Sequence, residues 1–285
     1  MGAFSILNNV SGVSAQNQLT LNSVNLNRTL LRLSSGRRVN SGADDAAGLQ
    51  IADSLRANVR ALDQAVRNAN DGISVAQIAD GALQEISNLL TRAVTLAEEA
   101  ATETVDSTGR ASLNAEFAQI QGEIARIASQ TNFNGMALFT ASGVNGSLSI
   151  FVGDTTGASS ISVTISTITV SGSTVTSLGG QNLVAVDLSG QTGAATALTT
   201  IKNALAGVSA MRANIGSGIN RLQAAVAVLQ SQSQNTQAAE STIRDANIAE
   251  EVANLTKYQI LAQTGIAALS QANANSQVVL NLIRR

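Results

Sequence analysis

Three pairs of adjacent carboxylates are the groups of this chain best suited by type to acid–base chemistry: Asp44-Asp45, Glu98-Glu99 and Glu250-Glu251. General acid–base catalysis needs groups that can reach the same reacting atoms. Neighbours along a helix point in different directions, so no pair can act together on one substrate. We therefore interpret these carboxylates as solvated charges or helix-end charges.

The other usual catalytic residues are absent or poorly placed. The sequence has no His and no Cys, which excludes the commonest general base, thiol nucleophiles and the usual zinc sites. The two lysines, Lys202 and Lys257, have no candidate nucleophile beside them. Residues 215–219 (IGSGI) lack the strand and the lysine of a phosphate-binding loop, so a local adjustment between helices explains them better. We expect no enzymatic activity, no cofactor and no metal site.

The net charge and the hydropathy of the chain limit the classes of partner that it can bind. The net charge of −2 and the lack of a basic stripe argue against nucleic acid, and no apolar run has the length of a membrane-spanning helix. Residues 1–7 lack the positive start of a cleaved secretory signal, so we expect none. Asn-X-Ser/Thr triplets begin at Asn9, Asn27, Asn145 and Asn254, but so short a pattern carries little weight.

Long helices are the elements that must position any functional surface. The chain is 44% hydrophobic but only 2% aromatic and has no Pro, a composition typical of long, closely packed helices. A narrow apolar stripe near the N-terminus predicts a coiled-coil helix that ends near Gly36, which can adopt a left-handed cap. The stripe consists of Leu19, Leu26, Leu30 and Leu33.

Two further helices are predicted in the first half of the chain. Asp44 and Asp45 suit the positive end of a helix that begins near residue 46. Apolar residues then keep helical spacing to about residue 101, which is longer than an ordinary globular helix. After a turn, a third helix is predicted at about 107–130, and it stops at residues 132–135 (NFNG).

The middle of the chain, about 136–190, changes to Ser, Thr, Gly and Val. Residues 148–152 (LSIFV) and 161–165 (ISVTI) alternate or run apolar with β-branched side chains, which predicts short strands. The segment is too short for more than a small β-hairpin region. Helical spacing returns from about 194 to about 241.

The C-terminal segment carries the most regular stripe. From Ile248 to Ile283 its members recur in steps of four and three, and polar members such as Gln259 and Asn273 could specify register at some loss of stability. Each terminal helix is weakly stable alone, so we expect the two ends to pair and their apolar flanks to be covered by assembly. The large apolar members are Val252, Leu255, Ile266, Leu269, Leu280 and Ile283.

Several motifs resemble those of the bacterial flagellins. Residues 41–52 (SGADDAAGLQIA) resemble the start of the flagellin rod domain, and residues 67–74 (RNANDGIS) look like the flagellin signature. Residues 130–135 (QTNFNG) are similar to the motif that closes the third helix, and residues 239–245 (AESTIRD) to the entry of the C-terminal helix. The resemblance covers about 18–135 and 212–285, and the short middle indicates a minimal member without large outer domains.

The resemblance implies a mainly α fold: a long-helix coiled coil or bundle formed by the paired terminal segments, with a small β-hairpin region in the middle. Residues 1–43 and 245–285 would form the inner coiled-coil domain, D0. The rod domain, D1, would comprise residues 44–190, with helices at about 46–101 and 107–130 and a β region at about 136–190, together with the helix at 191–244.

The resemblance also implies a function. A flagellin is a secreted, extracellular structural subunit that leaves the cell unfolded through the flagellar type III apparatus and polymerises into the flagellar filament for motility. The implied partners are other copies of the chain, an export chaperone, the filament cap, hook-associated proteins and Toll-like receptor 5. The family's receptor pattern falls on Arg92, Leu96, Glu99 and Glu116, with Glu99 replacing the usual Gln. These residues can instead serve packing between subunits, which we take as their primary role.

Rival interpretations remain open at this stage. The hook–filament junction protein has similar terminal helices, but we expect it to match residues 67–74 more weakly. A helical protein that binds membrane surfaces is disfavoured by the scarcity of Lys and the small net charge. Ser and Thr of the middle segment either carry O-linked sugars, as in some flagellins, or simply form solvated turns, which we favour slightly.

Overall fold

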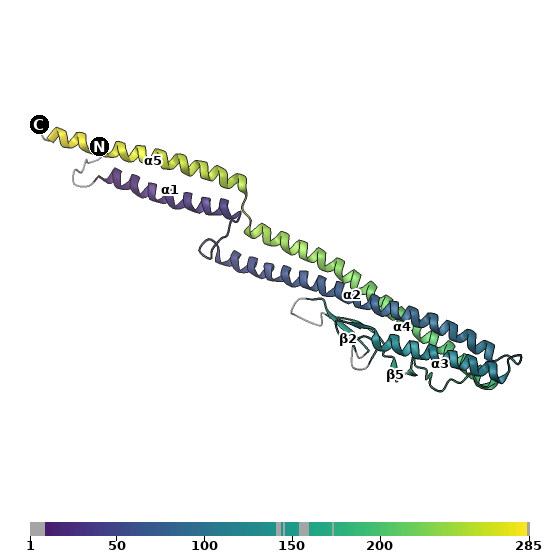
Figure 1. The fold of residues 1–285 in the computed structure, drawn as a ribbon. Coiled ribbons are helices and arrows are strands. Elements are labelled where there is room, and N and C mark those ends of the chain that lie inside the picture. The colour runs from purple at the N-terminus through teal and green to yellow at the C-terminus, as the bar shows by residue number, and fades with distance from the viewer. Residues whose placement is uncertain (1–8, 141–143, 145, 154–159, 173, 284–285) are drawn as a thin grey trace. The chain divides into compact units, whose positions relative to one another are not determined.

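A computed structural model describes residues 9–140, 144, 146–153, 160–172 and 174–283, without the side chains of 276 and 278–283 (Figure 1). This part of the chain forms long helices and three two-stranded antiparallel sheets, which confirms the predicted fold class. It divides into two compact units: residues 1–58 with 235–285, called unit 1, and residues 59–234, called unit 2.

Unit 1 is built on two antiparallel helices, α1 (Val10–Ser35) and α5 (Ile248–Ile283), which lie side by side (Figure 1). Asn9 caps α1, because its Oδ1 accepts a hydrogen bond from the backbone N–H of Gly12 at 2.9 Å. Gly36 ends the helix with a φ of 68°, the left-handed cap predicted for it.

The segments that follow α1 and precede α5 are hydrogen-bonded to each other within unit 1. The backbone N–H of Arg38 donates to the carbonyl of Arg244 at 2.7 Å, and that of Ala246 donates to Gly36 at 3.0 Å. The guanidinium of Arg38 also donates to the carbonyl of Ile243 at 2.7 Å. These bonds tie the two chain segments together at the same end of the α1–α5 pair.

Asp44 and Asp45 organise the turn before α2 (Ala46–Ala100). Asp44 Oδ2 accepts from the backbone N–H groups of Asn40 and Ser41 and from the Ser41 hydroxyl. Burial alone would raise the pKa of Asp44, but the hydrogen bonds from Ser41 and Asn40 hold it below its ordinary value. Asp45 Oδ1 accepts from the N–H of Gly48 at 2.8 Å and so caps the helix, as predicted.

Unit 2 packs three helices together: the greater parts of α2 and of α4 (Gln191–Arg244), and α3 (Ser107–Gln130). Asp106 caps α3 by accepting from Gly109 at 2.7 Å. The helices share one hydrophobic core, whose largest fully buried members include Leu83, Ile86, Leu90, Phe117, Ile124 and Phe139. Figure 1 shows α2 and α4 side by side, with α3 along them.

Ion pairs fix the antiparallel alignment of α2 and α4 in unit 2. Arg212 donates through Nε and Nη2 to the two carboxylate oxygens of Asp80 at 2.9 and 3.3 Å, and this hydrogen bonding raises the pKa of Arg212. Nearer the far end, Lys202 pairs with Glu98 at 3.3 Å. Residues later in α2 therefore pair with residues earlier in α4, as expected for antiparallel helices.

The β region lies beside α3 (Figure 1). It contains the pairs β1 (Asn132–Phe133) with β2 (Met136–Ala137), β3 (Leu148–Phe151) with β4 (Ser160–Val163), and β5 (Thr169–Ser171) with β6 (Thr174–Ser177). Asn134 and Gly135 join β1 to β2 with φ values of 51° and 79°, the left-handed values of a tight Asn-Gly hairpin turn. From the sequence, only the end of a helix is predicted at these residues.

Glycines allow the β region to approach α4 closely. A Cβ at Gly207 would lie 2.5 Å from the Cα of Gly179, so the backbones meet where neither residue can carry a side chain. A Cβ at Gly218 would lie 2.8 Å from Val163 Cγ1. The glycine-rich stretch at 215–219 therefore accommodates a strand rather than another helix, which corrects the expectation from sequence.

Candidate assembly surface

The contact between α1 and α5 in unit 1 combines fully buried small and polar residues with half-buried leucines. Gly12, Asn22 and Thr29 of α1 are buried, and Leu19, Leu26 and Leu33 are half-buried beside them. On α5 the contact face consists of Glu251, Leu255, Tyr258, Ala262, Gly265, Leu269 and Ala272. A Cβ at Gly265 would lie 3.3 Å from Leu19 Cδ1, which shows how closely the helices approach.

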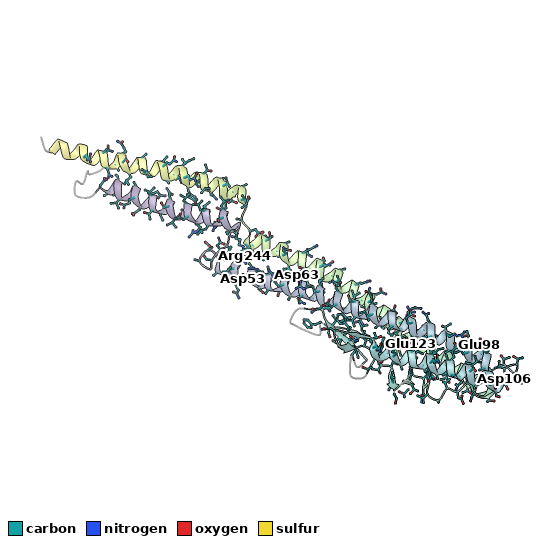
Figure 2. All side chains as sticks on the ribbon, viewed as in Figure 1. Asp53, Asp63, Glu98, Asp106, Glu123 and Arg244 are labelled. Atoms are coloured by element: carbon teal, nitrogen blue, oxygen red, sulfur yellow. The ribbon has the colours of Figure 1, made fainter. Side chains whose placement is uncertain are left out.

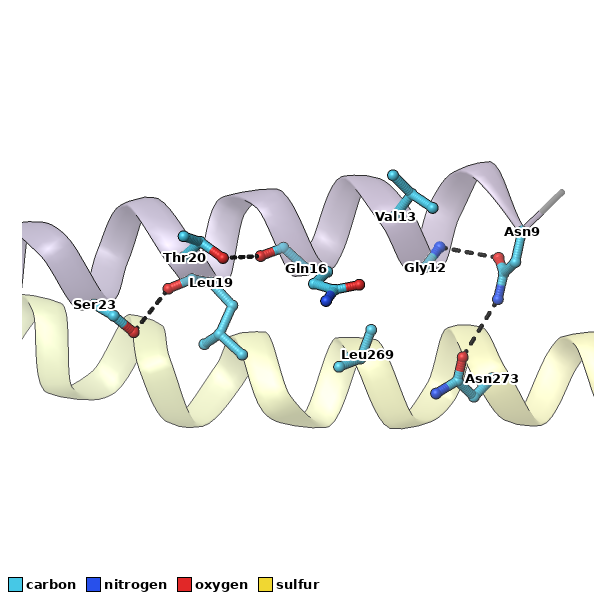
Figure 3. A pocket seen from close by; sticks show the side chains of 9 residues that line it. All are labelled: Asn9, Gly12, Val13, Gln16, Leu19, Thr20, Ser23, Leu269 and Asn273. Carbon is cyan, nitrogen blue, oxygen red and sulfur yellow. Dashed lines mark hydrogen bonds between the residues drawn. The ribbon is translucent and has the colours of Figure 1, made fainter.

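Polar side chains set the register of this contact. Asn9 Nδ2 donates to Asn273 Oδ1 at 3.4 Å (Figure 3) and also to the Ala272 carbonyl at 3.3 Å. At the other end, Arg32 donates to Glu251 at 3.4 Å. A shift of either helix by one turn would break both sets of bonds.

A shallow groove of about 520 Å³ runs between α1 and α5 (Figure 3). None of the described residues that line it is charged. Its lining residues are Asn9, Gly12, Val13, Gln16, Leu19, Thr20, Ser23, Leu269 and Asn273. Among the residues that the structure describes, no group of three or more carboxylates could hold a metal ion, and no helix has the length and apolar character to span a bilayer.

Many large aliphatic residues of unit 1 are exposed. Among the described residues of this unit, only Val39 and Ala52 are buried apolar side chains, whereas both hydrophobic core clusters lie in unit 2. Large apolar side chains exposed in such number are a candidate interaction surface. The exposed residues on the two terminal helices are Val10, Val13, Leu21, Val24, Leu30, Leu31, Ile248, Val252, Ile260, Leu261 and Ile266.

Comparison with known proteins identifies the family. Residues 6–143 match the bacterial flagellin N-terminal helical region, and residues 198–283 match the bacterial flagellin C-terminal helical region. The chain is 37% identical to a flagellin of Halalkalibacterium halodurans, over 98% of this chain and 99% of that protein. The chain belongs to the bacterial flagellin family. It is also 34% identical to the flagellar filament 31.3 kDa core protein of Treponema maltophilum, with 98% and 99% coverage.

Flagellins are structural proteins of the flagellar filament and not enzymes, so the family agrees with the absence of catalytic constellations in the sequence. A solved structure of a putative flagellar hook-associated protein from Vibrio parahaemolyticus has a similar fold. Its TM-score is 0.58 at 14% identity, and the match covers 71% of this chain and all of that one. At that identity the likeness concerns the fold alone, so the junction-protein alternative is weaker than the flagellin interpretation.

The residues predicted for the polymer core divide into two groups in this flagellin. Leu19, Leu26, Leu33, Leu255 and Leu269 are half-buried in the contact between α1 and α5. Three others remain exposed on the flanks of the pair: Leu30, Val252 and Ile266. The side chains of Leu280 and Ile283 lie outside the described residues.

The three adjacent carboxylate pairs act separately, as predicted. Asp45 is a helix cap, and Glu98 is solvated beside Lys202. Glu251 is a helix-end charge in the first turn of α5, one of the two roles expected, and it is buried and paired with Arg32 rather than solvated. There it also meets the positive end of the helix dipole.

Only some residues of the predicted receptor patch are exposed. Arg92 donates through Nε and Nη2 to Glu116 Oε1 at 2.9 and 2.8 Å, and Glu99 is exposed. Leu96 is 0% exposed and belongs to the core of unit 2, so its inclusion in an exposed patch was wrong. It lies on the face of α2 that carries Ala93, Ala97 and Ala100 into the core.

Sequence reasoning missed the outward apolar residues of α1. Val10, Val24 and Leu31 were not assigned to any stripe, because the predicted stripe consists of leucines on another part of the helix surface. A signal was present, since positions 10, 17, 24 and 31 are spaced by seven residues and three of the four are aliphatic.

Proposed function

We propose that this chain builds the flagellar filament by burying the outward aliphatic residues of α1 and α5 between copies of unit 1. The proposal is based on which side chains of unit 1 are buried and which are exposed. The fully buried residues of the contact within one chain are small or polar, its leucines are only half-buried, and eleven large aliphatic residues of the two helices are exposed. Such a pair of helices has an apolar surface that further copies of the chain can cover.

The energetics favour assembly over an isolated helix pair. Full burial of a Val, Leu or Ile side chain contributes about 1.5–3 kcal/mol, so burying the exposed half of each contributes roughly 1 kcal/mol. Several such residues on each face, repeated over several neighbours, can offset the several kcal/mol that association costs. The α1–α5 contact within one chain gains less apolar burial, because its leucines are only half-buried.

The domain organisation that we propose for the filament follows the motif boundaries. Residues 1–43 and 245–285 form the inner domain, D0, whose helices pack among copies. Residues 44–190 and 191–244 form the rod domain, D1, which has its own hydrophobic core. The core makes D1 stable without polymerisation, while the exposed aliphatic residues make D0 dependent on it.

We also propose a route of export and the partners that act during export and assembly. We expect the chain to be secreted by the flagellar type III apparatus and to work outside the cell. An export chaperone, the filament cap and hook-associated proteins are the partners proposed for its passage and assembly. The lack of Cys and Pro favours this route, because neither disulfides nor slow prolyl isomerisation can delay the chain.

Recognition by Toll-like receptor 5 is a separate proposal, restricted to Arg92, Glu99 and Glu116. These side chains form an exposed polar surface on α2 and α3. Arg92→Ala should weaken binding of monomer to the receptor, while Arg126→Ala on another part of α3 should not. Lack of binding by the unaltered monomer would exclude the receptor role.

Truncation tests the assembly proposal. A chain ending at Asn247 lacks α5 but retains the core of unit 2, so it should keep a cooperative thermal transition by circular dichroism. It should form no filaments under conditions where the full chain forms long, uniform ones by negative-stain electron microscopy. Ordinary filaments from the truncated chain would refute the role of α5, and absence of filaments from the full chain would refute the proposed function.

A further inference from the structure

Two exposed stripes of unit 1 share an unusual pattern. The outer stripe of α1 consists of Val10, Asn17, Val24 and Leu31, and the flank stripe of α5 consists of Val252, Gln259, Ile266 and Asn273. Each has seven-residue spacing, which keeps successive members on one side of a helix. Each also has an exposed amide side chain between two aliphatic ones.

The stripes face away from the contact within the chain. At 100° per residue, the outer stripe lies roughly opposite the Leu19–Leu26–Leu33 face of α1. The flank stripe lies about a quarter turn from the centre of the contact face of α5. Accordingly, Val10, Val24 and Leu31 are 70%, 50% and 65% exposed, and Val252 and Ile266 are 44% and 56% exposed.

We propose that the outer stripe of α1 in one copy docks antiparallel on the flank stripe of α5 in a second copy, with Asn17 opposite Gln259. Counting seven residues from that amide pair in opposite directions places Val24 against Val252 and Val10 against Ile266. Each aliphatic residue then meets another, and the two amides can donate and accept hydrogen bonds with each other. A polar pair inside an apolar stripe specifies the register.

The parallel alternative matches less well. With Asn17 still opposite Gln259, it places Leu31 against Asn273. Asn273 is already engaged within its own chain, because its Oδ1 accepts from Asn9. The antiparallel register avoids this conflict, since Leu31 then lies beyond the N-terminal end of α5 at Ile248.

The interface is heterologous, because the two stripes are different surfaces of the same copy. Each copy offers one unused stripe after the other is occupied, so the contact can repeat without closing on a twofold axis. This inference rests on the proposed function, assembly of copies through unit 1, and adds the surfaces and the register. Filaments built from other faces would leave that function intact and refute the register.

Cysteine cross-linking tests the register cleanly, because the natural chain has no Cys. Four single variants are made: Val10→Cys, Val24→Cys, Val252→Cys and Ile266→Cys. Each α1 variant is mixed with each α5 variant, the mixture is polymerised and pelleted, and disulfides are formed under mild oxidation. Mass spectrometry of linked peptides then identifies which positions are joined.

The four mixtures distinguish the arrangements. The antiparallel register predicts linkage of position 24 with 252 and of 10 with 266, because disulfides require closely facing Cβ atoms. The mixtures 24 with 266 and 10 with 252 are the matched controls, and their linkage would indicate a parallel register and overturn the proposal. Predominant links between identical positions would indicate a symmetric contact, and pelleted filaments without links would exclude both stripes.

A charge exchange provides a second readout that needs no cross-link. Asn17→Lys alone places an unpaired charge in the proposed interface and should raise the protein concentration needed for polymerisation. Adding Gln259→Glu in the same chain should restore it, since every copy supplies both stripes. Asn17→Lys with Gln271→Glu, an exposed amide on another side of α5, is the control, and equal rescue by both double variants, or by neither, would refute the pairing of 17 with 259.

Discussion

Arg244, at the end of α4, donates to Asp53 of α2 across 191 positions of sequence, with Nη1 3.1 Å from Oδ1 (Figure 2). The Arg244 side chain is 10% exposed, whereas that of Asp53 is 58% exposed. Glu240, one turn earlier on α4, lies 3.7 Å from the same Nη1. A nearly buried guanidinium therefore depends on two carboxylates at the point where the segments of unit 1 meet.

Removing Asp53 should weaken unit 1. Asp53→Ala leaves Arg244 with the longer contact to Glu240, and we expect a loss of about 1 kcal/mol, since the exposed carboxylate is partly screened. The readout is the temperature at which filaments dissociate, followed by sedimentation. Asp71→Ala, which removes an exposed carboxylate elsewhere on α2, is the control. Equal dissociation temperatures for both variants would show that the pair contributes nothing.

Two glycines of α4 should respond oppositely to alanine. Gly207→Ala places a Cβ 2.5 Å from the backbone of Gly179, so we expect about 1–3 kcal/mol of destabilisation from overpacking. Gly216→Ala meets no atom within 4 Å and should stabilise the helix by about 0.5–1 kcal/mol. Thermal unfolding of monomer by circular dichroism measures both. A destabilising Gly216→Ala would contradict the open environment at that position.

The helices were largely predictable because their signals are local. The caps at Gly36 and Asp45 and the long apolar spacing that follows residue 46 are sequence patterns, and the structure has them where predicted. The hairpin at Asn134-Gly135 was missed although Asn-Gly is a strong turn signal, because the flanking strands are only two residues long. Strands this short do not show the alternation of apolar and polar residues that indicates longer strands.

The face of α5 that meets α1 was less predictable. Of the expected stripe, Leu255, Ala262 and Leu269 lie in the contact, whereas Val252 and Ile266 are exposed. The contact also uses Tyr258 and Gly265, which were outside the stripe. Close approach of two helices favours small residues, and large aliphatic residues are left for surfaces that a single chain cannot supply. A large apolar residue in the sequence therefore indicates burial, but the burial occurs either within one chain or in the assembly.

Asp44 should make unit 1 sensitive to acid. Its folded pKa lies below the ordinary 3.8, so its contribution to stability is complete above that value and is lost as the pH falls through the lower folded pKa. Asp44→Ala lacks the contribution at every pH. The difference in filament dissociation temperature between the natural chain and this variant should hold above about pH 5 and shrink towards about pH 3. A difference that stays constant over this range would exclude Asp44, and Asp71→Ala again serves as control.

The ion pair between Arg32 and Glu251 lies between α1 and α5. Substituting its two members tests whether the pair adds net stability or serves the register of the helices. The side chains of Arg32 and Glu251 are 27% and 10% exposed, and Arg32 Nε is buried without a hydrogen-bond partner. Arg32→Met leaves the more buried Glu251 unpaired and should destabilise unit 1 by roughly 2–3 kcal/mol, while Glu251→Leu should have a smaller effect.

The double variant Arg32→Met, Glu251→Leu should recover most of the loss from Arg32→Met, because apolar replacement of both partners removes the unpaired charge. Filament dissociation temperatures of the natural chain and the three variants form a double-mutant cycle. A positive coupling with recovery indicates that the pair fixes the register of α1 and α5 rather than adding net stability. Additive losses would mean that the two charges act independently, and that the register depends on the Asn9 contacts at the other end of the helix pair.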